Sequence, residues 1–172
     1  AGALSPGYLP ISGTWSVADD ALHQTAATTG HILIDVGATD VAVETRGSLD
    51  APSGTPFGVN VDLRAGDENG NGALDVYSCG LRSDNSKSFV RVDSLDGVFV
   101  KLQRDGSDQP LSPAGDVHAV AGVVSQGIVG CAVDGASLTV LDSRLATETM
   151  VGLHASRGTA TFQYLAVYAL GP

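Results

Sequence analysis

The chain has 172 residues, a length that suits one domain with a substantial core. Its formal net charge of −10 repels phosphate backbones and anionic lipids, which argues against nucleic acid and membrane surfaces as partners. No segment approaches the about 20 unbroken apolar residues that a membrane span requires. No cleavable signal peptide is visible, so we expect a mature chain, a fragment or export by another route. We therefore expect a single domain over residues 1–172.

Predicted β-strands follow one another along the chain. An opening hairpin is expected over residues 14–17 and 21–24, with its turn at 18–20. A loop is expected over residues 104–115, and the further strands before the C-terminal segment are 31–36, 40–49, 57–64, 74–81, 87–93, 97–103 and 117–124. Turn signals every 8–12 residues or so are typical of a sandwich or barrel. The sequence therefore predicts an all-β fold, an antiparallel two-sheet β-sandwich.

The C-terminal segment carries the strongest turn signal. Asp134-Gly135 separates two runs of alternating apolar residues, and both central positions of a type I′ turn need positive φ. A strand with the sequence Val151-Gly152-Leu153 and a final strand over residues 160–168 come after this hairpin. We expect these strands to close the sandwich.

The two cysteines, Cys79 and Cys131, lie in predicted strand interiors. Cys131 is in phase with Val129 and Val133, so its side chain should point into the core. Two interpretations stay open at this point. The cysteines form a disulfide in an oxidising compartment, or they are two small buried thiols.

Several motifs carry a resemblance through their order along the chain. They are Gly13 to Val17 with Ala21-Leu22, Phe57-Gly58-Val59 ending in Leu63-Arg64, Val133-Asp134-Gly135, Val151-Gly152-Leu153 and Thr161-Phe162. In this order they resemble the concanavalin A-like (laminin-G-like) jelly roll. The opening residues 2–15 are similar to jelly-roll modules of minor tail and other virion-surface proteins of actinobacterial phages, and of secreted bacterial proteins.

This resemblance implies two curved sheets, with sugar held on the front sheet or its rim loops and calcium as a frequent companion. Relatives often carry an acidic-aromatic-Asn-Arg segment just before the position of Gly2. That segment is missing here, so we expect the chain to begin inside a longer polypeptide.

The acidic residues do not form the pattern of a glycoside hydrolase. Such enzymes need two carboxyl groups about 5 Å apart, or about 6.5–9.5 Å apart with an intervening water. Glu44 is alone on its predicted strand, Asp62 has no acidic partner two residues on, and a turn separates Asp93 from Asp96. The histidines are scattered and no Gly-x-Ser-x-Gly turn is present; they are His23, His31, His118 and His154. We expect no enzyme.

The segment from Asp67 to Asp75 resembles the first half of a calcium loop. Oxygen-bearing side chains at Asp67, Asn69 and Asn71, followed by Asp75, could converge on one cation. Ser78 stands where a bidentate glutamate would close the loop, so we expect weak binding of Ca²⁺ by these four residues. The alternative is a plain hairpin turn, because Asn-Gly pairs form turns without a metal.

Sugar recognition needs an aromatic face and a few polar groups. Phe99 is the best exposed aromatic candidate, whereas Trp15 is expected in the core. The other candidate ligand-binding residues are Lys101 and Gln103 on the same strand face, and Arg82, Arg91 and Asp93 on neighbouring strands. The alternative is that Phe99 contacts a partner protein or the second sheet.

Three functions remain open. The first is a non-catalytic surface-recognition and attachment module, binding a cell-surface glycan, on a phage virion or in a secreted bacterial protein. The second is a structural or decoration protein that packs through its jelly-roll faces against other virion subunits or copies of itself. The third is a glycoside hydrolase on the same scaffold. We favour the first, with a location on the virion surface or outside the cell.

Overall fold

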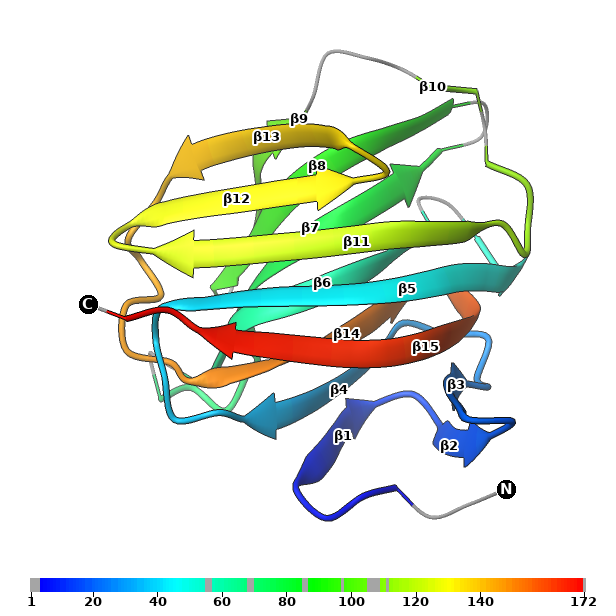
Figure 1. Ribbon diagram of the computed structural model, residues 1–172, viewed down its shortest axis with the longest axis horizontal. Helices are drawn as coiled ribbons and strands as arrows, with labels where there is room; N and C mark the ends of the chain where they lie inside the picture. Colours follow the sequence, from blue (N-terminus) through cyan, green and yellow to red (C-terminus); the bar gives the residue numbers. More distant parts are fainter. Residues whose placement is uncertain are drawn as a thin grey trace.

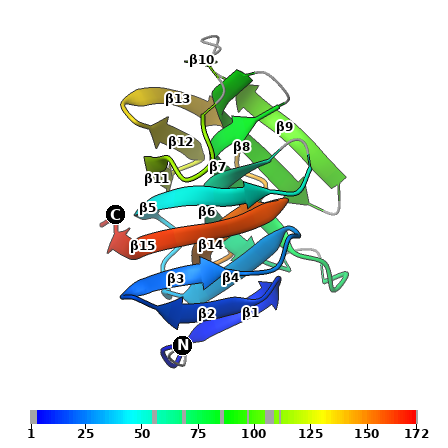
Figure 2. The same ribbon diagram turned by 90° about the vertical axis from the view of Figure 1, so that its right-hand side faces the viewer.

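The computed structural model describes residues 4–54, 57–67, 70–84, 87–96, 98–104, 109–110 and 112–171. Two antiparallel sheets pack face to face (Figures 1 and 2). Within the described ranges, one sheet has eight strands, in the order β1 (Tyr8–Ser12), β4 (Gly30–Asp35), β14 (Met150–Ser156), β6 (Phe57–Gly66), β7 (Asp75–Ser83), β8 (Lys87–Asp96) and β10 (Gln109–Pro110), with β9 (Val98–Arg104) also paired to β8. The other has seven, in the order β13 (Ala136–Leu141), β12 (Ile128–Val133), β11 (Val117–Ser125), β5 (Val41–Pro52), β15 (Gly158–Ala169), β3 (Ala21–Gln24) and β2 (Trp15–Ala18).

This architecture confirms the predicted all-β, two-sheet sandwich. The predicted hairpins are also confirmed, because Asp19, Asp20, Asp134 and Gly135 all have positive φ at their turns. Strand β1 was not predicted, and β10 lies inside the segment expected to be a loop. In the part of the chain that the structure describes, no helix is long and apolar enough to cross a membrane.

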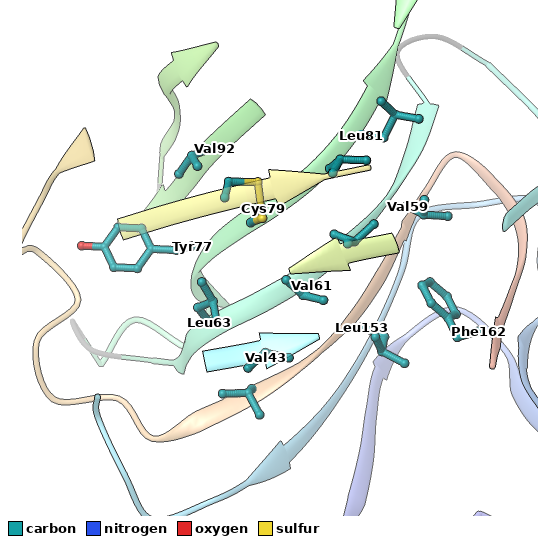
Figure 3. Packing of buried hydrophobic residues seen from close by; sticks show 14 of the residues in the cluster. Val43, Val59, Val61, Leu63, Tyr77, Cys79, Leu81, Val92, Leu153 and Phe162 are labelled. Atoms are coloured by element: carbon teal, nitrogen blue, oxygen red, sulfur yellow. A yellow bond between two sulfur atoms is a disulfide. The ribbon is translucent and has the colours of Figure 1, made fainter. Parts of the chain in front are cut away.

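The core lies between the two sheets (Figure 3). Strands β6 and β7 supply Val61, Leu63 and Tyr77, and Trp15 is buried here as expected. Cys79 on β7 and Cys131 on β12 form a disulfide that joins the two sheets, with a sequence separation of 52. This bond decides between the two interpretations of the cysteines. A cross-link of that span stabilises the fold by about 4 kcal/mol in the chain-entropy model.

Three neighbouring strands of the eight-stranded sheet are buried on both faces. Every residue of β7 is buried, and so are nearly all residues of β6 and β14. Side chains alternate along a strand, so only every second residue can face the seven-stranded sheet. On β6, Val61 faces the core and Asp62 faces outward, yet both have no exposed surface. The outer face of this sheet is therefore covered by its own side chains, both polar ones such as Asp62 and apolar ones such as Leu33 and Val76.

Candidate functional site

A pocket of about 220 Å³ lies on the outer face of the eight-stranded sheet. Strands β4, β14, β7 and β8 supply most of its walls. Its lining residues are Thr29, His31, Val76, Ser78, Arg82, Asp93, Leu95, His154, Ser156 and Arg157. Eight of these ten residues are polar or charged, and Val76 and Leu95 add apolar side chains to the wall.

Strand register explains why these side chains meet. Asp62 on β6 pairs with Ser78 on β7, which pairs with Asp93 on β8. In the next row, His31 on β4 pairs with His154 on β14. Neighbouring strands lie about 4.8 Å apart, so residues in one row on one face are in contact range. The pairing therefore stacks polar side chains from distant parts of the sequence.

Asp62 is the centre of the buried cluster. One carboxylate oxygen, Oδ1, accepts a hydrogen bond of 2.6 Å from the Ser78 hydroxyl. The other, Oδ2, lies 2.7 Å from Nδ1 of His31, and Oδ1 lies 3.5 Å from Nδ1 of His154. Burial would raise the pKa of Asp62, but the charge of His31 and the hydrogen bonds of both histidines outweigh it and hold the pKa well below its usual range. Asp62 is therefore an ionised, fully engaged carboxylate.

His154 connects this carboxylate to the pocket. Burial, together with the neighbouring charge of His31, lowers the pKa of His154 to about 4, so the imidazole is neutral at physiological pH. Its Nε2 lies 2.9 Å from the Ser156 hydroxyl, and its ring stacks on that of His31 with 3.9 Å between centroids. The neutral ring of His154 lies between the carboxylate of Asp62 and the hydroxyl of Ser156, so these two neighbours fix the orientation of the ring at the pocket wall.

Arg82 and Asp93 bring charge into the pocket itself. An Nη1 proton of Arg82 is donated to the Ser156 hydroxyl, whereas its buried Nε–H has no partner among the described residues. Burial lowers the pKa of Arg82, an effect that the charge of Asp93 opposes. Burial also raises the pKa of Asp93, against the ion pair that Arg91 makes with it. The carboxylate of Asp93 is thus bonded to Arg91, with Arg82 close by.

One group of side chains in the described ranges could hold a metal ion. The ligand atoms of His31, Asp62 and His154 lie within 4.8 Å of one another. Two imidazoles and a carboxylate are ligands that transition metals accept. The hydrogen bonds between His31, Asp62 and Ser78 already satisfy this group without a metal, so its geometry is explained by the protein alone.

The predicted calcium loop falls partly within the described residues. The two carboxylate oxygens of Asp67 accept the backbone N–H groups of Asn71 and Gly72, and the side-chain oxygen of Asn71 accepts that of Ala73. Asp75 is fully buried at the start of β7, and Asn69 lies outside the described residues. The observed bonds are those of a turn, and calcium binding stays a prediction.

The predicted ligand-binding residues divide into two groups. Arg82 and Asp93 line the pocket, and Arg91 bonds to Asp93, so three of them come together. Lys101 and Gln103 are exposed on β9, which pairs with β8 so that Lys101 lies opposite Asp93. The side chain of Phe99 lies outside the described part of the chain.

Sequence reasoning missed the centre of the site. It treated the histidines as scattered, which is wrong for His31 and His154, since strands β4 and β14 are neighbours and bring the rings into contact. It also gave no role to Ser78 and Ser156. The sequence does show a polar residue at an outward-facing position of each central strand. Only the strand order, however, shows that these positions are neighbours.

A second histidine cluster lies at one end of the sandwich. Nε2 of His118 is 2.7 Å from the Ser112 hydroxyl, and its Nδ1 is 2.6 Å from a carboxylate oxygen of Asp134. This order of groups is that of a Ser-His-Asp triad, which the sequence did not predict. The side chain of Asp134 is 50% exposed, and Pro113 directly follows Ser112 and so provides no N–H for an oxyanion. We assign this cluster no catalytic role.

No protein-family model matches the chain, and neither does any curated protein sequence. Among solved structures, it is similar to the carbohydrate-binding module CBM66 from Bacillus subtilis, with a TM-score of 0.73, 12% identity and 94% of each chain covered. It is also similar to the GH43 protein BlXynB from Bacillus licheniformis, with a TM-score of 0.68 and 12% identity over 98% of this chain but 38% of that one. An alginate lyase from Pseudomonas aeruginosa matches with a TM-score of 0.59 and 17% identity, over 92% of this chain and 87% of that one. The chain therefore has the jelly-roll sandwich fold of these proteins.

Proposed function

We propose that the chain is a non-catalytic glycan-binding module, and that its ligand occupies the pocket on the outer face of the eight-stranded sheet. The observation that carries this proposal is the set of buried polar side chains that line that pocket, among them Ser78, His154 and Ser156. Each is held by its neighbours, so the ligand meets groups whose positions are already fixed. The names of the structural neighbours, a carbohydrate-binding module and two kinds of carbohydrate-active enzyme, agree with a glycan ligand.

The hydrogen bonds favour binding over hydrolysis. Asp62 and Asp93 lie in one row with Ser78 between them, but neither is a free carboxyl group. Asp62 bonds to Ser78 and His31, and Asp93 to Arg91. A glycosidase needs one carboxyl group to deliver a proton and another to act as nucleophile or base. Two carboxylates that are fixed by other partners suit recognition better.

A second candidate is an enzyme that acts on the same glycan. It is favoured by the neutral imidazole of His154, placed between Asp62 and the Ser156 hydroxyl at the wall of the pocket. An imidazole in that state can accept a proton from a bound sugar. Release of reducing ends or of unsaturated sugars would support this candidate.

We further propose that the module acts in attachment, on the surface of a phage virion or in a secreted bacterial protein. The sequence resemblance to virion-surface and secreted modules supports this location, and so does the disulfide between Cys79 and Cys131, which suits an oxidising compartment. The alternative role, packing against copies of itself or other subunits, draws support from the exposed Leu141, Tyr164 and Tyr168 on the seven-stranded sheet.

Affinity electrophoresis through gels that contain single polysaccharides, neutral and acidic, tests the binding function. We expect retardation by at least one of them, lost in Ser156→Ala because Arg82 and His154 then lose their shared partner. The control is Tyr168→Phe, on the outer face of the other sheet, which should migrate as the wild type does. Retardation that survives Ser156→Ala and disappears in Tyr168→Phe would place the ligand on the other sheet and refute the proposed site.

A further inference from the structure

We infer that the ligand of this pocket is an acidic saccharide, whose anionic group binds beside the guanidinium of Arg82. The inference rests on the proposed glycan-binding function and adds the chemical class of the ligand. The anionic group is a uronate carboxylate or a sulfate ester, since a guanidinium pairs with either.

The guanidinium of Arg82 is incompletely bonded within the described part of the protein. The residue is only 9% exposed, which is rare for arginine unless it is paired. Its guanidinium donates to the neutral hydroxyl of Ser156, and its Nε–H has no partner among the described residues. A buried donor without an acceptor costs about 1–3 kcal/mol. A ligand anion in the pocket would compensate a charge that the protein leaves incompletely bonded.

Among the described residues, the one carboxylate that lines the pocket, that of Asp93, is already bonded to another arginine. Asp93 also lines the pocket and attracts Arg82, but its carboxylate accepts a hydrogen bond from Nε of Arg91. Burial raises the pKa of Asp93, and the charge and hydrogen bond of Arg91 oppose that rise. Asp93 therefore neutralises one arginine of the two, and the pocket keeps a positive charge.

Positive charge is scarce in this chain and is concentrated near the pocket. The protein has a net charge of −10 and only nine lysines and arginines. Four of these cations lie in or next to this pocket: Arg82 and Arg157 line it, Arg91 bonds to the lining residue Asp93, and Lys101 pairs with Asp93 across β8 and β9. A positive site on an otherwise acidic surface attracts an anion and orients it during approach.

The rest of the pocket suits the uncharged part of a sugar. Ser78 and His154 bring hydroxyl and imidazole groups that can bond to ring hydroxyls, and His154 is neutral, so it does not compete for the anion. Val76 and Leu95 provide apolar contact for the C–H face of a pyranose ring. One strong cation, several neutral polar groups and a small apolar wall are complementary to one anionic sugar unit.

Isothermal titration calorimetry with the full chain tests this inference. The ligands are oligogalacturonate and oligoalginate, the methyl ester of the oligogalacturonate, a sulfated galactan oligomer, and neutral oligomers of xylose and fructose. We expect at least one acidic oligomer to bind at least tenfold more tightly than the neutral ones. If it is the uronate, its methyl ester should bind at least tenfold more weakly. If it is the sulfated oligomer alone, the anion is a sulfate ester.

The variant Arg82→Met should weaken binding of the acidic oligomer at least 30-fold while the protein keeps its wild-type midpoint of thermal unfolding, or exceeds it, because a buried charge is removed. The matched control is Arg46→Met on β5, an exposed arginine of the other sheet, which makes the same change in net charge and should alter binding less than twofold. If Arg82→Met does not fold, Arg82→Lys keeps the charge, loses the planar fork and should still weaken binding at least fivefold.

The two proposals fail in different ways. Equal affinity for neutral and acidic oligomers, or loss of binding in Arg46→Met to the same degree as in Arg82→Met, overturns the acidic ligand and leaves glycan binding intact. Absence of binding to every oligomer and polysaccharide overturns both.

Discussion

The outer faces of the two sheets differ in how much of their side-chain surface is exposed to solvent. On the seven-stranded sheet, Tyr164, Tyr168 and Leu141 are 42%, 53% and 82% exposed. On the eight-stranded sheet, His31, Arg82 and His154 are each less than 10% exposed, although no second layer covers them among the described residues. One face is a solvated exterior, and the other is a polar layer in which side chains bury one another.

The difference comes from the number of hydrogen bonds and ion pairs that the polar side chains make with one another. Glu44, on the outer face of the seven-stranded sheet, accepts a hydrogen bond of 3.0 Å from the exposed Tyr168 hydroxyl, a contact that water can replace. Asp62, on the other sheet, has Ser78, His31 and His154 around it and no exposed surface. Polar groups that exclude water depend on each other, and such a layer is costly to disrupt. This mutual bonding distinguishes the proposed binding surface from the solvent-exposed outer face of the other sheet.

The largest expected effect is that of Asp62→Asn, which removes the buried charge that His31 and His154 face. We expect a loss of about 3–5 kcal/mol in the free energy of unfolding, because one partner of a buried charge network disappears. Glu44→Gln, the control on the other sheet, should change it by less than about 0.5 kcal/mol. Urea unfolding followed by fluorescence of Trp15 measures both. Equal losses in the two variants would show that the two faces do not differ.

The next effect is a loss of stability in acid that depends on His154. Its pKa is about 4 in the folded protein, against 6.5 for an ordinary histidine, so the unfolded chain binds more protons between these values. Stability should therefore fall as the pH decreases from about 6.5 to about 4, by ~3 kcal/mol in total. His154→Gln should flatten the profile of unfolding free energy against pH in that window. A His154→Gln profile as steep as that of the wild type would contradict the buried neutral imidazole.

A smaller effect is expected for Ser78→Ala. The substitution removes the hydroxyl that donates to Asp62 and leaves a buried acceptor with one bond fewer, at a cost of about 1–3 kcal/mol. Ser137→Ala, on β13 of the other sheet, is the control and should cost less than about 0.5 kcal/mol. Thermal unfolding of both variants compares them, and a neutral Ser78→Ala would mean that water replaces the lost donor.

Sequence patterns predicted the sandwich well because its strands follow local rules. The Asp134-Gly135 turn and the alternation on β6 each depend on neighbours in the chain. Strand β1 was missed because Leu9 and Ile11 are exposed and its pattern has no buried face to detect.

The site was harder to predict because it depends on which strands are neighbours. Asp62 was noted to have no acidic partner two residues on, whereas its actual partners His31 and His154 come from β4 and β14, far away in the sequence. Arg82, Arg91 and Asp93 were identified as candidates because β7 and β8 are consecutive strands and their pairing can be expected locally. Polar residues that meet only through the strand order leave no comparable trace in a single sequence.

The most direct test of the account is to map a bound saccharide on the protein by NMR. Imidazole and guanidinium resonances of His31, His154 and Arg82 would be followed during titration with the best-binding oligomer, alongside the ring resonances of Tyr164 and Tyr168. The account predicts saturable shifts in the first three residues and none in the two tyrosines. Saturable shifts confined to the tyrosines, with His154 and Arg82 unmoved, would contradict it.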